Sequence, residues 1–163
     1  MLAEGQLCFC RFWIGVGLPG NVTGTCYRDH VIAWPKEVGR SIDYLETLPD
    51  LDHDKLAYEG FSMGAPFGGL FPDIEDRFKV LVLIAPGFFL NKRLPESDVI
   101  NFAPRVEAPV LMLNGRLDFI FPPGSMQEPM FRWLGTPAQQ KRRVVYDSGH
   151  DIPRNEQIKE ALN

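Results

Sequence analysis

The chain has 163 residues, of which 45% are apolar and 23% are charged. This length and balance indicate one globular domain with a sizeable core and argue against a disordered chain. The net charge of −4 provides no basic face for a nucleic acid, and no stretch reaches the ~18 apolar residues that a membrane span needs.

The N-terminal region has no recognisable targeting signal. The apolar residues 7–16 lack a basic segment before them and a clear cleavage site after them. We therefore expect a soluble, cytoplasmic protein. Three cysteines are too few for a disulfide scaffold, and Cys8, Cys10 and Cys26 are expected to be small apolar residues of the core.

Short apolar runs alternate with amphipathic stretches, a pattern typical of βαβ units and a mostly parallel sheet. Strands are predicted at residues 7–16, 55–60, 79–85, 109–115 and 142–147. Helices are predicted at residues 36–48, with Pro35 in the first turn, and at 62–70, 125–135 and 154–162. Residues 88–108 are predicted to form a loop or short lid. The expected fold is a three-layer α/β sandwich forming one domain over 1–163, in which 1–26 are an atypical strand and loop.

One serine stands in a Gly-x-Ser-x-Gly pattern at a predicted strand-to-helix junction: Ser62, between Gly60 and Gly64. Small flanking residues permit a turn so tight that the serine oxygen is exposed at the end of the sheet. The N–H groups of a following helix would face an oxyanion formed there. The pattern alone is weak evidence, because glycine and serine are common turn residues.

A nucleophilic serine needs a base and a carboxylate that orients the base. Asp118 follows the predicted strand 109–115, and His150 follows the strand 142–147. Both lie just beyond the carboxyl ends of parallel strands, where the active sites of open α/β sheets form. The chain order is serine, acid, histidine, which His30 and His53 do not fit.

Together, the segments GFSMGA, LNGRLDFIFP and SGHD resemble the catalytic half of an α/β-hydrolase. The resemblance is to the esterase branch with dienelactone-hydrolase-like and prolyl-oligopeptidase-like domains, and it spans residues 27–162. It implies that Ser62 is the nucleophile, His150 the base and Asp118 the orienting acid. It also implies that the backbone N–H of Met63 donates to the oxyanion, and that neither a metal nor an organic cofactor is needed.

The chain departs from this family in its N-terminal part. Only the strand 7–16 precedes the helix before Ser62, so several strands and the loop with a second oxyanion donor are missing. A right-handed crossover places strand 7–16 beside strand 55–60. We predict that the backbone N–H of Gly17 or Leu18 supplies the second donor.

The missing strands are also expected to leave an apolar edge or face. Phe9, Phe12 and Trp13 are candidates to cover it. Self-association through this shortened side is therefore predicted.

Residues 15–20 match G-x-G-x-x-G after a predicted strand, which raises the alternative of a dinucleotide site. A dinucleotide site needs a helix that begins at these glycines and an acidic residue about 20 positions further on, at the end of a strand. Pro19 is a poor start for such a helix. Asp43 lies at about the right distance, but inside a predicted helix and not at a strand end. A simple loop is the plainer interpretation. Four aromatic residues flank the predicted site and fit either an acyl pocket or the core: Phe88, Phe89, Phe119 and Phe121.

The sequence thus predicts a serine carboxylesterase that acts on small, short-chain esters. Two alternatives remain open: a peptidase or other acyl hydrolase with the same triad, and a catalytically impaired binding protein that lacks a complete oxyanion hole.

The basic run Lys141, Arg142 and Arg143 is expected at the solvated start of the last strand.

Overall fold

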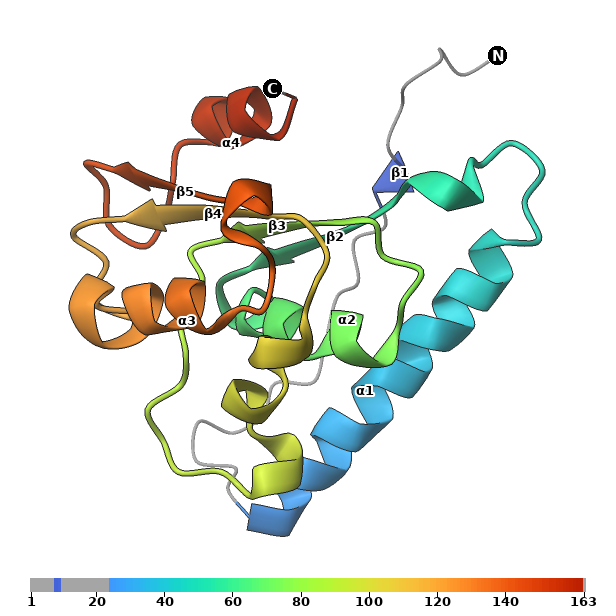
Figure 1. Cartoon of the computed structure of the whole chain (residues 1–163), viewed down its shortest axis with the longest axis horizontal. Helices are drawn as coiled ribbons and strands as arrows, with labels where there is room; N and C mark the ends of the chain where they lie inside the picture. Colours follow the sequence, from blue (N-terminus) through green and yellow to red (C-terminus); the bar gives the residue numbers. More distant parts are fainter. Residues whose placement is uncertain (1–7, 10–23, 163) are drawn as a thin grey trace.

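The computed structural model describes residues 8–9 and 24–162, and of residues 8–9 only the backbone. The described strands form one five-stranded parallel sheet in the order β1-β2-β3-β4-β5. The strands are β1 Cys8–Phe9, β2 Leu56–Phe61, β3 Val80–Ile84, β4 Val110–Gly115 and β5 Lys141–Tyr146. The α-helices are α1 Gly24–Leu45, α2 Phe71–Ile74, α3 Glu128–Trp133 and α4 Arg154–Ala161. The helices α1, α2 and α3 lie on one face of the sheet and α4 on the other (Figure 1), so the three-layer α/β prediction is confirmed.

The strands β2 to β5 begin and end within one residue of the predicted ranges. In β3, Leu81 and Leu83 join the core under α1, whereas Val82 and Ile84 pack on the opposite face with Ile152. Because both faces of this strand are buried, its sequence is a continuous apolar run and does not alternate.

The strand β1 pairs in parallel with β2, with Cys8 opposite Leu56 and Phe9 opposite Ala57. The predicted side-by-side placement of these two segments is therefore confirmed for the described residues. The remainder of the predicted strand 7–16, and the loop with Gly17 and Leu18, lie outside the described residues.

The predicted start of the first helix is wrong. α1 begins at Gly24 and carries Pro35 in its interior. An interior proline costs about 3 kcal/mol, because it removes one helical hydrogen bond. Burial offsets this cost, since fully burying one large apolar side chain contributes about 1.5–3 kcal/mol. The buried residues of α1 follow one another at helical spacing along a single face: Tyr27, Val31, Trp34, Pro35, Val38 and Ile42.

The expectation that Cys26 belongs to the core is also wrong, since its side chain is exposed and its thiol is free. Tyr27 and Val31 form the buried face of this turn of α1. Successive helix residues point about 100° apart, so Cys26 faces outward. Cys10 lies outside the described residues.

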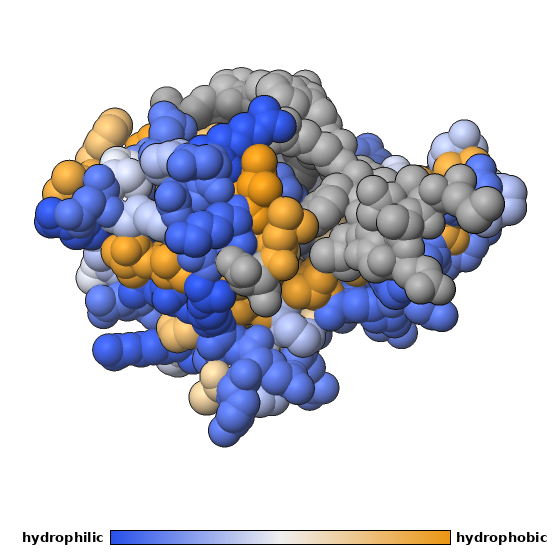
Figure 2. Space-filling view, turned by 90° about the horizontal axis from the view of Figure 1, so that it is seen from above, coloured by the Kyte–Doolittle hydropathy of each residue, from blue (hydrophilic) through white to orange (hydrophobic). Residues whose placement is uncertain are grey.

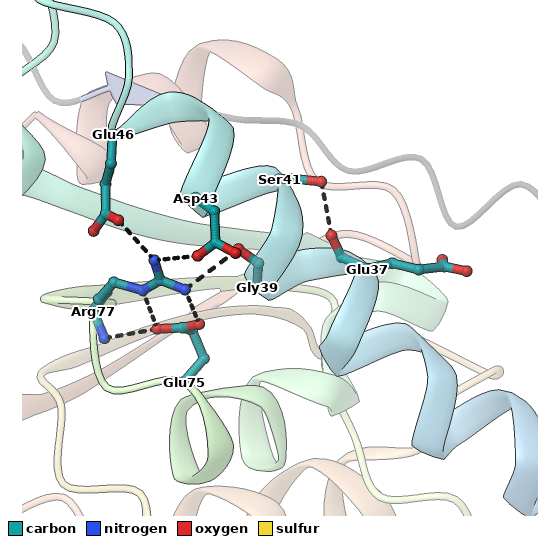
Figure 3. A network of polar contacts seen from close by, with 7 residues as sticks. All are labelled: Glu37, Gly39, Ser41, Asp43, Glu46, Glu75 and Arg77. Carbon is teal, nitrogen blue, oxygen red and sulfur yellow. Dashed lines mark hydrogen bonds and ion pairs between the residues drawn. The ribbon is translucent and has the colours of Figure 1, made fainter.

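One arginine ties the last turns of α1 to the segment between α2 and β3 (Figure 3). Arg77 binds both carboxylate oxygens of Glu75, each at 2.6 Å. It also donates to Asp43 at 2.8 Å, to Glu46 at 3.0 Å and to the Gly39 carbonyl at 3.3 Å. The hydrogen bonds from Arg77 to Glu75 lower the pKa of the Glu75 carboxyl below its ordinary value, because they favour its charged form.

The segment after Ser62 is not the continuous helix 62–70 that the sequence predicts. Ser62–Gly64 and Pro66–Gly69 are single 3₁₀ turns, and α2 begins only at Phe71. Pro66 has no N–H to continue a helical ladder, and two glycines follow it closely. The chain therefore passes through tight turns here.

Close packing explains the glycines of this segment, as predicted. A Cβ atom on Gly68 would overlap the side chain of Leu83, and one on Gly69 would lie 2.8 Å from Cγ1 of Val99. Side chains at these positions would push the turns away from the sheet.

Three further predicted segments are close to the structure. A π-helical turn, Pro123–Gln127, leads into α3, which ends before Gly135. Residues 88–108 form a loop with single 3₁₀ turns, from which Val99, Ala103 and Val106 are buried in the core. α4 matches its predicted range to within one residue.

The face of the sheet that carries α4 is only partly covered by the described residues. A groove of about 420 Å³ runs between β2, β3 and α4. Its lining is Glu59, Phe61, Val82, Ile84, Arg154, Gln157, Ile158, Ala161 and Leu162. Figure 2 views the molecule from this side and shows apolar surface in the middle of the face, beside a polar region. None of the described helices has the length and apolarity to cross a bilayer.

Candidate active site

Ser62 directly follows β2 and opens a 3₁₀ turn. Its φ of +50° lies in the left-handed region, which is strained for a residue with a side chain and costs on the order of 1–3 kcal/mol. A Cβ atom on Gly60 would lie 2.7 Å from the carbonyl oxygen of Gly64 and 2.8 Å from Cα of Ala65. Only glycine fits at position 60 without a backbone shift, as the sequence pattern requires.

A buried tyrosine supports this turn from beneath. Tyr58 is 4% exposed, and its hydroxyl donates to the Gly64 carbonyl at 2.6 Å. Burial raises the pKa of this hydroxyl, so the group remains a neutral donor. The sequence does not single out Tyr58, because an aromatic side chain in a buried strand is typical of the core alone.

Asp118 lies in the loop after β4 and is 2% exposed. Its Oδ1 accepts the backbone N–H groups of Ile120 at 2.8 Å and Phe121 at 3.0 Å. Its Oδ2 is 2.9 Å from Nδ1 of His150. The two backbone bonds fix the carboxylate plane and leave the second oxygen for the imidazole.

His150, in the loop after β5, connects the acid to the serine. Its Nε2 is 2.6 Å from the Oγ of Ser62. A carboxylate can only accept a hydrogen bond, so the single ring proton of a neutral His150 is on Nδ1, whose N–H donates a hydrogen bond to Oδ2 of Asp118. The lone pair of Nε2 is then free to accept a hydrogen bond from the hydroxyl of Ser62. The structure thus brings together all three residues that the sequence singles out.

The surroundings of His150 are aromatic. The ring centroids of Phe61 and Phe121 lie 5.8 and 5.9 Å from that of His150, and Phe89 contacts Phe121 at 5.7 Å. Of the four aromatic residues flagged in the sequence, Phe88 is core, whereas Phe119 is 83% exposed. They therefore do not form one pocket wall.

Only one of the three residues predicted to donate to an oxyanion lies among the described residues. Met63 follows Ser62 within the same 3₁₀ turn. The helix expected to direct its N–H groups at this place is absent, because 62–70 is folded into short turns. Gly17 and Leu18 lie outside the described residues, so the second donor stays a prediction.

Two further predictions from the sequence concern residues that the structure describes. Arg143 is not solvated as expected: its side chain is 14% exposed and binds Asn114 at 3.0 Å and Gln127 at 2.8 Å. Asp43 lies within α1 and pairs with Arg77, as its predicted helical position implies. The G-x-G-x-x-G segment 15–20 lies outside the described residues.

A parallel sheet with a serine on a strained turn after one strand, and an acid and a histidine after later strands, is the arrangement of the α/β-hydrolase fold. The chain has this fold in a shortened form. No protein-family model matches the sequence, and no curated protein matches it.

Solved structures of α/β-hydrolase esterases are similar to the chain. One is a cold-adapted esterase from an Arctic intertidal metagenomic library in a zinc-bound form, with 25% identity and a TM-score of 0.67 over 81% of this chain and 56% of that one. Another is an acetyl xylan esterase from a Paenibacillus species, with 19% identity and a TM-score of 0.66 over 82% of this chain and 52% of that one.

A third is acetyl xylan esterase 1 from a Thermoanaerobacterium species. It has 18% identity and a TM-score of 0.63, over 90% of this chain and 59% of that one. The chain therefore spans little more than half the length of the esterases that it matches.

Proposed function

We propose that the chain is a serine ester hydrolase in which Ser62 is the nucleophile, His150 the general base and Asp118 the acid that orients it. The observation that carries this proposal is the continuous hydrogen-bonded series from Ser62 through His150 to Asp118, at 2.6 and 2.9 Å. The similarity to esterases favours an ester over a peptide substrate.

In the first half-reaction, Nε2 of His150 takes the hydroxyl proton of Ser62 as Oγ attacks the ester carbonyl carbon. The tetrahedral intermediate collapses to an acyl-enzyme, and the departing alkoxide takes the proton from His150. In the second half-reaction, His150 deprotonates a water molecule that attacks the acyl carbon. The carboxylic acid product is released, and the proton returns from His150 to Ser62.

We assign the oxyanion contact to the backbone N–H of Met63, with Gly17 or Leu18 as the source of the second donor. Donors held in place before the reaction stabilise the charge as it develops. The segment 88–108 is packed into the core through Val99, Ala103 and Val106, which leaves little chain for a large lid. We therefore propose small, short-chain esters as substrates.

A fluorophosphonate probe tests the proposal directly, because it reacts only with an activated serine. We expect one adduct per chain, which peptide mass spectrometry places on Ser62, and none in Ser62→Ala. On p-nitrophenyl acetate, Ser62→Ala should lower kcat by about a million-fold, the scale for a triad serine in a serine protease.

An intact, folded chain that gives no adduct would rule out the hydrolase and favour a binding protein with an unfinished oxyanion site. Faster cleavage of peptide anilides than of p-nitrophenyl esters would instead favour the peptidase alternative.

A further inference from the structure

A buried amide lies beneath the loop that carries Asp118. Gln127, the last residue of the π-helical turn, is completely buried. Its Nε2 donates to the carbonyl of Gly115 at 3.0 Å and to the carbonyl of Phe121 at 2.7 Å. Gly115 ends β4, and Phe121 comes three residues after Asp118. One nitrogen atom therefore connects the two ends of the loop that holds the acid.

The orientation of this amide is fixed by an arginine. Arg143 donates to Oε1 of Gln127 at 2.8 Å. A guanidinium has donors only, so the oxygen of the amide must face Arg143 and its NH₂ group must face the two carbonyls.

Arg143 itself is held on its other side. Its Nε donates to Oδ1 of Asn114 at 3.0 Å, and Nδ2 of Asn114 donates to the carbonyl of Pro86 at 3.1 Å. The amides of Asn114 and Gln127 are both buried and both bonded through nitrogen and oxygen. Buried polar networks that are satisfied in this way are rigid.

Phe121 connects this network to the triad. Its carbonyl accepts from Gln127, its N–H donates to Oδ1 of Asp118 at 3.0 Å, and its ring contacts that of His150 at 5.9 Å. A shift of the Phe121 backbone would therefore move a donor of Asp118 and a neighbour of His150 together.

We propose that Gln127, oriented by Arg143, is a positioning residue that sets Asp118 against His150. This inference rests on the proposed hydrolase function. Gln127 touches no triad atom, and its effect passes through the backbone of the loop from Gly115 to Phe121. Because it does not face Ser62, it should affect the chemical step and not the binding of a small ester.

The test compares Gln127→Met with Gln139→Met, the same substitution at an exposed glutamine. On p-nitrophenyl acetate, Gln127→Met should lower kcat about 10- to 100-fold and leave KM within two-fold, whereas Gln139→Met should change neither. The acid-side midpoint of kcat/KM should also move to lower pH in Gln127→Met, because a displaced Asp118 stabilises the imidazolium less.

Gln127→Glu provides a second variant if the methionine variant does not fold. It keeps an oxygen acceptor for Arg143 but removes both donors to the loop, so the same loss of kcat and the same pH shift are expected. A wild-type enzyme that is active, together with folded Gln127 variants of unchanged kcat and pH profile, would overturn the inference. A loss of activity that follows only the unfolded fraction, with no pH shift, would also overturn it. An inactive wild type without a Ser62 adduct would instead refute the proposed function itself.

Discussion

Ser62 occupies a backbone conformation that side chains rarely adopt, with φ at +50°. Three features around it make this conformation accessible. The Ala65 N–H donates to the Ser62 carbonyl at 3.1 Å, Tyr58 holds the Gly64 carbonyl, and Gly60 leaves room for the turn. The geometry of the serine is thus determined by its neighbours, and substitutions beside it should be as damaging as those in the core.

At this scale the first prediction concerns Gly60. In Gly60→Ala, the new Cβ would press on the backbone of Gly64 and Ala65, and overpacking of this kind costs about 1–3 kcal/mol. We expect a loss of about 2 kcal/mol in the free energy of unfolding and at least ten-fold slower fluorophosphonate labelling of Ser62. Urea denaturation and labelling kinetics measure the two effects.

Gly124→Ala is the matched control, because a Cβ there meets no atom within 4 Å. It should unfold and label like the wild type. Equal behaviour of the two variants would show that the turn after β2 adapts to a side chain at position 60.

The sequence predicts Ser62, Asp118 and His150 because each follows a recognisable strand, and parallel strands bring their carboxyl ends together. The side chains that hold these three residues in place could not be predicted in this way. Gln127 and Arg143 bond through pairings between a π-helical turn and two strands, and nothing in their spacing along the chain indicates such contacts. The charge of the basic run 141–143 predicts that all three side chains are solvated, and it gives no sign of the burial of Arg143.

Among the elements, α1 illustrates how burial overrides local preference. The preference of proline for the first turn of a helix predicts a helix start at Pro35. The apolar positions Tyr27 and Val31 continue the buried face on the N-terminal side of Pro35, and this longer pattern decides where the helix begins. Conversely, Pro66 and the glycines after it keep 62–70 from forming the helix that the fold family suggests.

The second prediction tests the contact between α1 and the serine turn. Trp34 is 4% exposed and meets Phe67 edge to face at 5.2 Å. Truncating a buried aromatic residue costs about 3–5 kcal/mol, so Trp34→Ala should lower the free energy of unfolding by that amount. Trp133, which is 53% exposed, provides the control, and Trp133→Ala should change stability by less than about 1 kcal/mol. Similar losses in both variants would contradict the packing of α1 described above.

Across the whole molecule, the Arg77 cluster joins parts of the chain that are distant in sequence. Glu75 has a lowered pKa, so its stabilising contribution is present above its ordinary value of 4.5 and is lost as the pH falls through the lowered value. Arg77→Gln should therefore lower the free energy of unfolding by about 2 kcal/mol at pH 7. The difference in the free energy of unfolding between Arg77→Gln and the wild type should shrink towards pH 3. In the wild type, protonation of Glu75 removes its ion pair with Arg77. In the variant, protonation relieves the repulsion among the carboxylates of Glu75, Asp43 and Glu46.

Urea unfolding from pH 7 to pH 3 measures this dependence. Arg132→Gln is the control, since the Arg132 side chain is 80% exposed and its ion pair with Glu128 is 3.9 Å long. It should follow the wild-type curve. A difference for Arg77→Gln that stays constant over the pH range would exclude the ion-pair explanation.

The chain matches little more than half of the cold-adapted esterase and of the Paenibacillus acetyl xylan esterase, and the face beside α4 has a groove of mixed apolar and polar lining among the described residues. The sequence predicts an apolar edge or face where the N-terminal strands of the family are missing. Self-association through that side stays a prediction, which sedimentation velocity of the full chain would measure.

The order of the strands has a consequence for how the protein folds. Because neighbours in the sheet are also consecutive in the chain, β2, β3 and β4 can assemble stepwise as synthesis proceeds. The bond between Ser62 and His150, however, joins residues 88 positions apart, and such non-local contacts form slowly. The contact between Ser62 and His150 therefore forms only when β5 has docked on the sheet. The rate at which Ser62 becomes reactive towards a covalent label would then measure the rate of the last folding step.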